Sequence, residues 1–450
     1  MKDLRWLGGR GVRSAVIVFL FLALGLQLWL SMRRQSISWD EDDHLWAGYM
    51  SLTRQDYGIN PEHPPLLKMV AALPLLGMSL HLPQQHPERN FKSEAFLNGR
   101  DFLFQNNANE MLAWARTSVA VFTFLLAALV LLAAWEMFGA GAGLLALAFF
   151  VFEPNLIAHG AFVTTDMALS CFLFASLYAF FRYVRRPGWG RLGVTGLAVG
   201  LLLASKHSGI LIFPMLGLLL LGELWLSEER GRALWHKALR WCGALVAIAA
   251  IGVAILWAFY GFRYAARPAE LALSPSLAES LRGMAPGQGA FVALCARWHL
   301  LPESYLYGLL DVQQLSLYMP TYIFGKVHAH GVWYYFPCAY AIKATLGVMA
   351  MLAIALWAVA TRRIRAGREM LYLALPALFY AVVAMCSGVN IGARHILPIF
   401  MLGCVLAAGG GAAWRRWLCW RTLRVRCAAS PTTSPTPTRR GADRRGCMST

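Results

Sequence analysis

Four consecutive acidic residues, Asp40 to Asp43, follow the first long apolar run of the chain, between Trp39 and His44. Adjacent carboxylates raise one another's pKa unless a cation or a hydrogen-bond donor is held beside them. A carboxylate in such a cluster could take the proton of a substrate hydroxyl. A solvated acidic loop has the same composition, so the cluster alone marks a candidate site without assigning a reaction.

A second polar cluster lies in the later segment NPEHPPLLK, which contains Glu62, His63 and Lys68. Two prolines between them predict the start of a helix, because proline is well suited to the first helical position. The amphipathic segment 64–76 is expected to lie along the membrane interface. The pattern therefore predicts a carboxylate, an imidazole and an ammonium group near the head of one short helix.

The elements that position these clusters are predicted to be membrane-spanning helices. Of the 450 residues, 58% are hydrophobic and only 14% are charged, against roughly 25% charged in a soluble domain. The apolar runs are continuous, whereas strands of a membrane barrel would alternate. The expected fold class is an all-α polytopic membrane protein.

Ten apolar segments approach the length of about 20 residues that a spanning helix needs. They are approximately 15–30, 112–134, 141–158, 165–181, 192–207, 209–226, 238–260, 338–360, 370–386 and 394–413. The first follows basic residues but precedes no cleavage site, so we expect an uncleaved first span with a cytoplasmic N-terminus.

Basic residues gather in alternate connections between these segments, as the positive-inside rule requires of cytoplasmic loops. They are Arg182, Arg185, Arg186, Arg191, Arg230, Arg232, Lys237, Arg240, Arg362, Arg363, Arg365, Arg368 and, after the last segment, Arg415, Arg416 and Arg421. This distribution accounts for the net charge of +18 and argues against nucleic acid as a partner, since no basic stripe interleaved with aromatics is present.

The predicted transmembrane domain is 1–413, with two large extracytoplasmic loops at 33–111 and 261–337. Large loops on one face favour chemistry or binding on that face. The basic, Ser/Thr/Pro-rich tail 414–450 is predicted to be a disordered cytoplasmic tail, or else an out-of-frame end that replaces further spans. The cysteines form no Cys-x-x-Cys pair, although Cys295 and Cys338 are candidates for a disulfide.

Several segments resemble, in order, the dolichyl-phosphate-mannose protein mannosyltransferases, which are family 39 of the glycosyltransferases. The family belongs to the glycosyltransferase C superfamily and includes bacterial aminoarabinose transferases. The similar segments are Asp40-Glu41, NPEHPPLLK, His159-Gly160 with Thr164-Thr165-Asp166-Met167, Gly200 to Ser208, Tyr334-Tyr335-Phe336-Pro337 with Lys343, and GARHILP from Gly392. The resemblance covers about residues 35–410, and the chain departs from it at the tail.

This resemblance implies an inverting glycosyltransferase of the bacterial inner membrane, acting at the outer face. Its donor would be a sugar on a polyprenyl phosphate, and its acceptor a hydroxyl of a protein, lipid or polysaccharide. Asp40 would be the catalytic base, with Glu41 beside it and Asp166 orienting acceptor or base. His63, Lys206 and Arg394 would bind the donor phosphate. The further candidates for substrate binding are Glu62, Lys68, His395, Tyr334 and Tyr335.

Two alternatives remain open at the level of sequence. Glu62 with His328 or His330 could bind a divalent metal, although two ligands are too few to define a site. A secondary transporter would also combine many spans with intramembrane charges, but such proteins usually have internal repeats, and this sequence has none that we detect.

Overall fold

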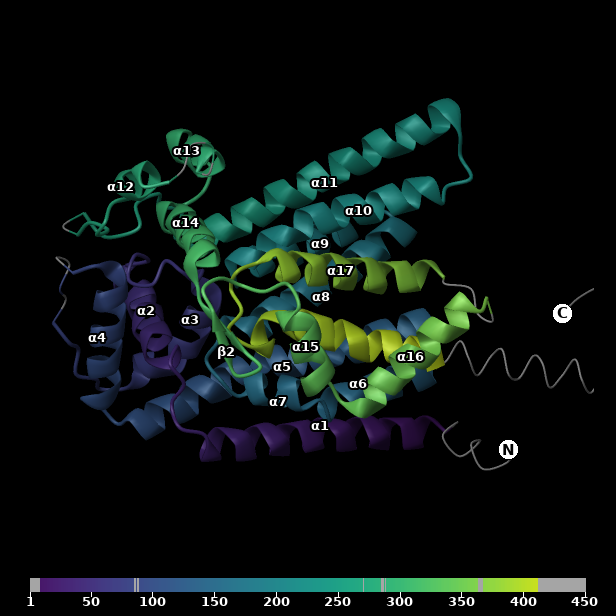
Figure 1. Ribbon diagram of the computed structural model, residues 1–450, viewed down its shortest axis with the longest axis horizontal. Helices are drawn as coiled ribbons and strands as arrows, with labels where there is room; N and C mark the ends of the chain where they lie inside the picture. Colours follow the sequence, from purple (N-terminus) through teal and green to yellow (C-terminus); the bar gives the residue numbers. More distant parts are fainter. Residues whose placement is uncertain are drawn as a thin grey trace, which may run out of the picture.

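The computed structural model describes residues 9–84, 86, 89–269, 271–284, 287, 289–362 and 367–411, and most of these residues are helical. The expected tail 414–450 and the basic residues Arg363 and Arg365 lie outside the described residues. A bundle of long helices occupies most of the molecule in Figure 1, and shorter elements gather at one end of it.

The bundle consists of apolar helices joined by short connections. They are α1 (Arg10–Arg34), α5 (Ala108–Phe138), α6 (Ala140–Val151), α7 (Pro154–Gly160), α8 (Thr165–Arg185), α9 (Trp189–Leu203), η3 (His207–Leu211), α10 (Ile212–Trp225), α11 (Gly231–Phe259), α15 (Tyr335–Lys343), α16 (Leu346–Ala360), α17 (Arg368–Cys386) and a last span over Ala393–Gly411 that opens with η4 (Ala393–Ile396).

All ten predicted apolar segments are helical, and the all-α membrane fold class is confirmed, but the number of spans is smaller. Seven helices in the described residues are long and apolar enough to cross a membrane, and up to nine if each of two bent pairs is one span. The remaining segment, α9, has 15 residues, which is about 22 Å of helix, less than the bilayer core of about 30 Å.

The two bent pairs are α6 with α7, at 63°, and α15 with α16, at 114°. Pro154 begins α7 and holds the preceding Glu153 in an extended conformation, because the residue before proline avoids the helical region. The Glu153 carboxylate accepts hydrogen bonds from the backbone N–H and the hydroxyl of Thr345, at the second bend. The polar groups that lack a helical partner at one bend thus hydrogen-bond to groups at the other bend. Inside a bilayer such groups need partners within the protein.

The two large loops fold into short elements at the same end of the bundle (Figure 1). The first loop forms α2 (Glu41–Arg54), α3 (Pro65–Ala72), η2 (Leu73–Gly77) and α4 (Phe91–Phe104), and the second forms α12 (Leu277–Arg282), α13 (Ala290–Arg297), α14 (Glu303–Tyr318) and a hairpin of β1 (Thr321–Ile323) and β2 (Lys326–His328). The segment predicted to be interfacial packs its apolar side, including Leu66 and Leu67, against α2 and α5.

One buried ion-pair cluster joins the two loops. Arg267 donates to Asp56 at 3.1 Å and to Glu94 at 2.7 Å and 3.0 Å, and all three side chains are almost completely buried. Both loops are therefore held as one unit over the end of the bundle. Cys295 and Cys338, the disulfide candidates, are both free thiols, in α13 and α15.

Replacing Arg267 should destabilise this unit strongly. In Arg267→Met the two carboxylates stay buried without a cation, and breaking a buried pair in this way costs about 3–5 kcal/mol. Denaturant unfolding of the purified protein in detergent would measure the loss.

The matched control is Arg100→Ala on α4 of the first loop, the helix that carries Glu94, because Arg100 is exposed and pairs with the adjacent Asp101. Exposed pairs contribute about 0–1 kcal/mol, so Arg100→Ala should change little. Equal stability of the two variants would contradict a structural role for the Arg267 cluster.

The predicted orientation can be tested with single cysteines in a chain whose native cysteines are replaced. Gln55 and Gln313 are exposed at the end that holds the two large loops, while Gly188 and Gly231 begin α9 and α11 at the other end. Cysteines at the first two positions should react with membrane-impermeant reagents in whole cells, and cysteines at the last two should not. If Gln55 and Gly188 behaved alike, the orientation would be wrong.

Candidate functional site

A cavity of about 400 Å³ lies beneath the two large loops, where they meet the bundle. Its wall is formed by residues from distant parts of the chain, and many of them are charged or titratable. These are Asp40, Glu62, His63, Lys92, Asp166, Lys206, His207, Arg394 and His395. Most of the residues predicted from sequence are thus brought together at one cavity.

Two carboxylate–cation pairs dominate the wall. Asp40 accepts from Arg394, although the two are separated by most of the chain. Asp166 accepts from Lys206 Nζ at 2.5 Å, with 3% of the Asp166 side chain and 14% of the Lys206 side chain exposed. Both pairs therefore place a carboxylate and a cation at the cavity surface.

The start of a helix holds each of these carboxylates. Asp40 is the residue before α2, and Asp166 lies in the first turn of α8. Each side chain therefore lies at the positive end of a helix dipole, which attracts negative charge.

Glu41 points away from the cavity, in contrast to its neighbour. It is fully buried and forms a two-point ion pair with Arg116 at 2.6 Å and 2.8 Å, and it accepts from the backbone N–H groups of Ser38 and Val163. Asp40 lines the cavity, whereas the ion pair with Arg116 holds Glu41 on the other side of the start of α2. This placement suits Glu41 to a structural role.

Lys68 also lies outside the cavity. It is buried and donates to the backbone oxygen of Asn60 at 2.6 Å, while the Asn60 amide donates to Asp43 at 2.7 Å. Burial lowers the pKa of Lys68 to about 7, against the opposing effect of Asp43. These contacts fix the loop that carries Glu62 and His63.

Two histidines of the first loop, His44 and His63, lie side by side, and His63 lines the cavity. His44 Nδ1 donates to the backbone oxygen of Val163 at 2.8 Å, and its ring meets that of His63 edge to face. Burial, then His44 and Lys206, hold the pKa of His63 well below its usual range. His63 therefore faces the cavity as a neutral imidazole, able to donate one hydrogen bond.

A third charged cluster joins α4 to α14 beside the cavity. Lys92 on α4 pairs with Glu62 and, at 3.0 Å, with Asp311 on α14. Burial and the neighbouring Asp311 raise the pKa of Glu62 to about 7, although Lys92 opposes the shift. The sequence analysis missed Lys92 and Asp311, because nothing in their local sequence distinguishes them from surface charges.

Arg116 was also missed, although a signal was available. It lies within the predicted span 112–134, and a charged residue inside an apolar span is usually functional or paired. Its partner, Glu41, belongs to the motif already singled out.

The candidates of the late loop lie outside the cavity wall, except that Phe336 lines it. Tyr334 and Tyr335 precede Phe336 but do not line the cavity. His328 ends β2 and His330 follows it. Among the described residues, no group of three or more His, Cys, Asp or Glu side chains is arranged to hold a metal ion, and Glu62 pairs with Lys92.

Most of the remaining cavity wall is apolar. Side chains of the second loop, of η3, and of α17 with its following turn provide this surface, among them Leu211, Val312, Leu315, Met319, Val383 and Ile391. The cavity therefore combines a charged end with an apolar surface, a combination that suits an amphiphilic ligand.

Solved structures of similar fold include two of ArnT from Cupriavidus metallidurans. The one bound to undecaprenyl phosphate is 17% identical with a TM-score of 0.55, over 91% of this chain and 63% of ArnT. The apo one is 17% identical with a TM-score of 0.53, over 94% and 66%. The chain thus spans slightly less than two thirds of the length of ArnT.

A third similar structure is the archaeal oligosaccharyltransferase AglB from Archaeoglobus fulgidus, in complex with an inhibitory peptide and a dolichol-phosphate. It is 12% identical with a TM-score of 0.52, over 95% of this chain and 53% of AglB. At these identities the likeness concerns the fold alone. A comparison with curated proteins found no match.

The sequence profile of one family matches residues 17–268, which is more than half of the chain. The matched region contains the cavity residues Asp40, Glu62, His63, Asp166 and Lys206. The chain belongs to the dolichyl-phosphate-mannose-protein mannosyltransferase family.

Proposed function

We propose that this protein transfers a sugar from a polyprenyl-phosphate carrier to an acceptor hydroxyl at the outer face of the membrane, with inversion at the anomeric carbon. The observation that carries the proposal is the cavity itself, where two carboxylate–cation pairs, Asp40–Arg394 and Asp166–Lys206, adjoin an apolar wall. Family membership and the carrier lipids bound to ArnT and AglB support it.

The cations account for recognition of the donor phosphate. Lys206 and Arg394 lie at the cavity wall, and His63 adds a neutral donor beside them. Hydrogen bonds from cations to phosphate are among the strongest that proteins form. The same cations stabilise the phosphate as it leaves with an additional negative charge.

Asp40 then serves as the general base. The acceptor oxygen attacks the anomeric carbon, the bond from that carbon to the phosphate oxygen breaks, and the acceptor proton passes to the Asp40 carboxylate. A phosphate that draws Arg394 toward itself loosens the Asp40–Arg394 pair and frees the carboxylate for the acceptor. Asp166, held by Lys206, orients the acceptor or the base from the head of α8.

The apolar wall suits the prenyl chain. Val312 and Leu315 on α14 and Val383 on α17 face the cavity, and α17 belongs to the bundle that the bilayer surrounds. Burial of an apolar chain contributes about 25 cal/mol per Å² of surface removed from water. The alternative hypothesis of a secondary transporter has no comparable support, because the matching family is one of transferases.

Asp40→Asn should lower turnover by about 10²–10⁴-fold, the usual contribution of a positioned base. Asparagine keeps the size of the side chain but cannot take the proton, so donor binding should change little. The measurement is transfer of radiolabel from polyprenyl-phosphate sugars to membrane extract by the purified protein, which also identifies the acceptor.

The matched control is Asp42→Asn. Asp42 belongs to the same acidic run but does not line the cavity, so its variant should retain nearly full activity. Lys206→Ala should weaken donor binding as well as turnover, since its charge meets the phosphate before and during the reaction. Full activity of Asp40→Asn would refute the assignment of the base, and no transfer by the unmutated protein with any donor would refute the function.

The pKa of Glu62 predicts how donor affinity depends on pH. Below about pH 7 Glu62 keeps its proton, and above it Glu62 is a carboxylate that repels a phosphate in the same cavity. Affinity for a polyprenyl-phosphate sugar, whose phosphodiester keeps one charge throughout, should therefore fall as the pH rises from about 6 to about 8.

Glu62→Gln is neutral at every pH and should reduce this fall to the part that comes from Lys68, which loses its charge in the same pH range, while leaving affinity at the lower pH nearly unchanged. Binding titrations of both proteins across the range provide the measurement. An identical pH profile for the variant would show that Glu62 is not the group responsible.

A further inference from the structure

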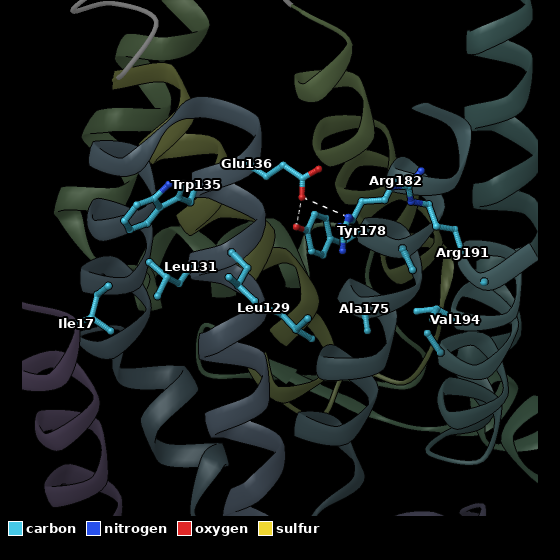
Figure 2. A pocket seen from close by; sticks show the side chains of 14 residues that line it. Ile17, Leu129, Leu131, Trp135, Glu136, Ala175, Tyr178, Arg182, Arg191 and Val194 are labelled. Carbon is cyan, nitrogen blue, oxygen red and sulfur yellow. Dashed lines mark hydrogen bonds and ion pairs between the residues drawn. The ribbon is translucent and has the colours of Figure 1, made fainter. Parts of the chain in front are cut away.

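A second and larger pocket, of about 870 Å³, lies on the outside of the bundle. Helix α8 forms its floor, α5 and α9 form its walls, and Ile17 of α1 closes one side (Figure 2). Its volume falls within the range of about 300–1,000 Å³ typical of ligand pockets. None of its residues takes part in the catalytic cavity.

The pocket is far from that cavity along the same helix. Asp166, at the start of α8, lines the cavity, whereas Arg182, near the end of α8, lines the pocket. Sixteen residues of helix separate them, which is about 24 Å. The pocket therefore belongs to the opposite end of the bundle, where the sequence predicts the cytoplasmic face.

Small side chains give the pocket its depth. Ala175 and Ala179 lie one turn apart on α8, and Gly190 and Ala198 belong to the α9 wall. Leu132 and Val194 line the pocket and remain more than half exposed. Apolar surface of this kind on a helix bundle faces the acyl chains of the bilayer.

The polar lining residues gather at one level of the pocket. Figure 2 shows Glu136, Tyr178, Arg182 and Arg191 at one end, and Ile17, Leu129, Ala175 and Val194 at the other. The polar end coincides with the membrane boundary, because Trp189 and Trp225, which are 86% and 83% exposed at neighbouring helix ends, are typical of the interfacial belt.

The charges of this polar end favour an anion. Tyr178 donates to Glu136 at 2.5 Å, and Arg182 pairs with the same carboxylate at 3.4 Å. Glu136 would repel an anion, but its carboxylate is already paired with Tyr178 and Arg182. Arg191 adds a second positive charge, so the polar end has a net positive charge. Helix α9 also begins here without a side-chain cap, so its first N–H groups add to the attraction.

We propose that this pocket binds an anionic phospholipid of the adjacent leaflet, with its phosphate between Arg182 and Arg191 and an acyl chain along Ala175 and Val194. Basic pockets between spanning helices at the cytoplasmic side are suited to anionic headgroups. A zwitterionic lipid fits less well, because its ammonium group would need a free carboxylate and Glu136 is occupied.

The test is native mass spectrometry of the full-length protein in detergent, titrated with dioleoyl phosphatidylglycerol or dioleoyl phosphatidylcholine. The unmutated protein should bind the anionic lipid at least about tenfold more tightly. Arg182→Ala with Arg191→Ala should remove this preference, since a tenfold change needs only about 1.4 kcal/mol, which is within the contribution of a charged hydrogen bond.

The matched control is Arg232→Ala with Arg240→Ala, which removes the same charge from exposed positions of α11 that do not line the pocket. It should keep the preference. A third variant, Ala175→Leu, fills the pocket with its charges intact and should weaken phosphatidylglycerol binding, which tests the site even if the double arginine variant fails to fold.

Three results would overturn the proposal. They are equal binding of the two lipids by the unmutated protein, an unchanged preference in the Arg182/Arg191 variant, and an equal loss in the Arg232/Arg240 variant, which would show attraction by net charge alone. Because binding and not transfer is measured, none of them depends on the proposed activity.

Discussion

The ion pair between Glu41 and Arg116 fixes the position from which the rest of the site is built. All five N–H groups of the Arg116 guanidinium have acceptors: two oxygens of Glu41 and the backbone oxygens of Met32, Gln35 and Ser36. A buried cation is tolerated only when it is paired and fully hydrogen-bonded. Arg116 therefore joins α5 to the end of α1 and the start of α2, and Asp40 is positioned by that junction.

The same constraint explains why the two large loops behave as one body. Arg267 brings Asp56 and Glu94 of the first loop together with the second loop, and Lys92 brings α4 to α14 through Asp311. The Arg267 cluster places opposite charges out of water, where their interaction is strong and depends on direction, whereas the Lys92 side chain remains 35% exposed. The two loops thus cover the cavity together, and the ion pairs between them fix their relative position.

Bent helices contribute the remaining part of the site's geometry. Glu153 links the break between α6 and α7 to the break between α15 and α16, because it accepts from Asn155 at the first and from Thr345 at the second. Polar groups that each break would leave without partners are thus hydrogen-bonded. The second break lies just beyond Phe336, which lines the cavity. Irregular backbone at membrane depth is tolerated only where protein covers it in this way.

Much of this protein could be predicted from its sequence, because the relevant physics is local. Continuous apolar runs identified every helical segment of the bundle, since burial of a helix in lipid depends on composition over about 20 residues. The motifs also identified Asp40, Asp166, Lys206 and Arg394, which the structure gathers at one cavity. Charged residues at the ends of apolar runs are informative by themselves.

Other features depend on which segments meet, and only the tertiary structure decided them. In the part of the chain that the structure describes, ten predicted spans became seven to nine, because α9 is too short to cross the bilayer core and hydropathy does not register the two bends. Adjacent acids look equivalent in sequence, yet Asp40 lines the cavity and Glu41 is buried against Arg116, because the partner of Glu41 lies 75 residues further along the chain. Lys92, Asp311 and the groove beside Arg182 were unpredictable for the same reason: their environment is made by residues far away in the chain.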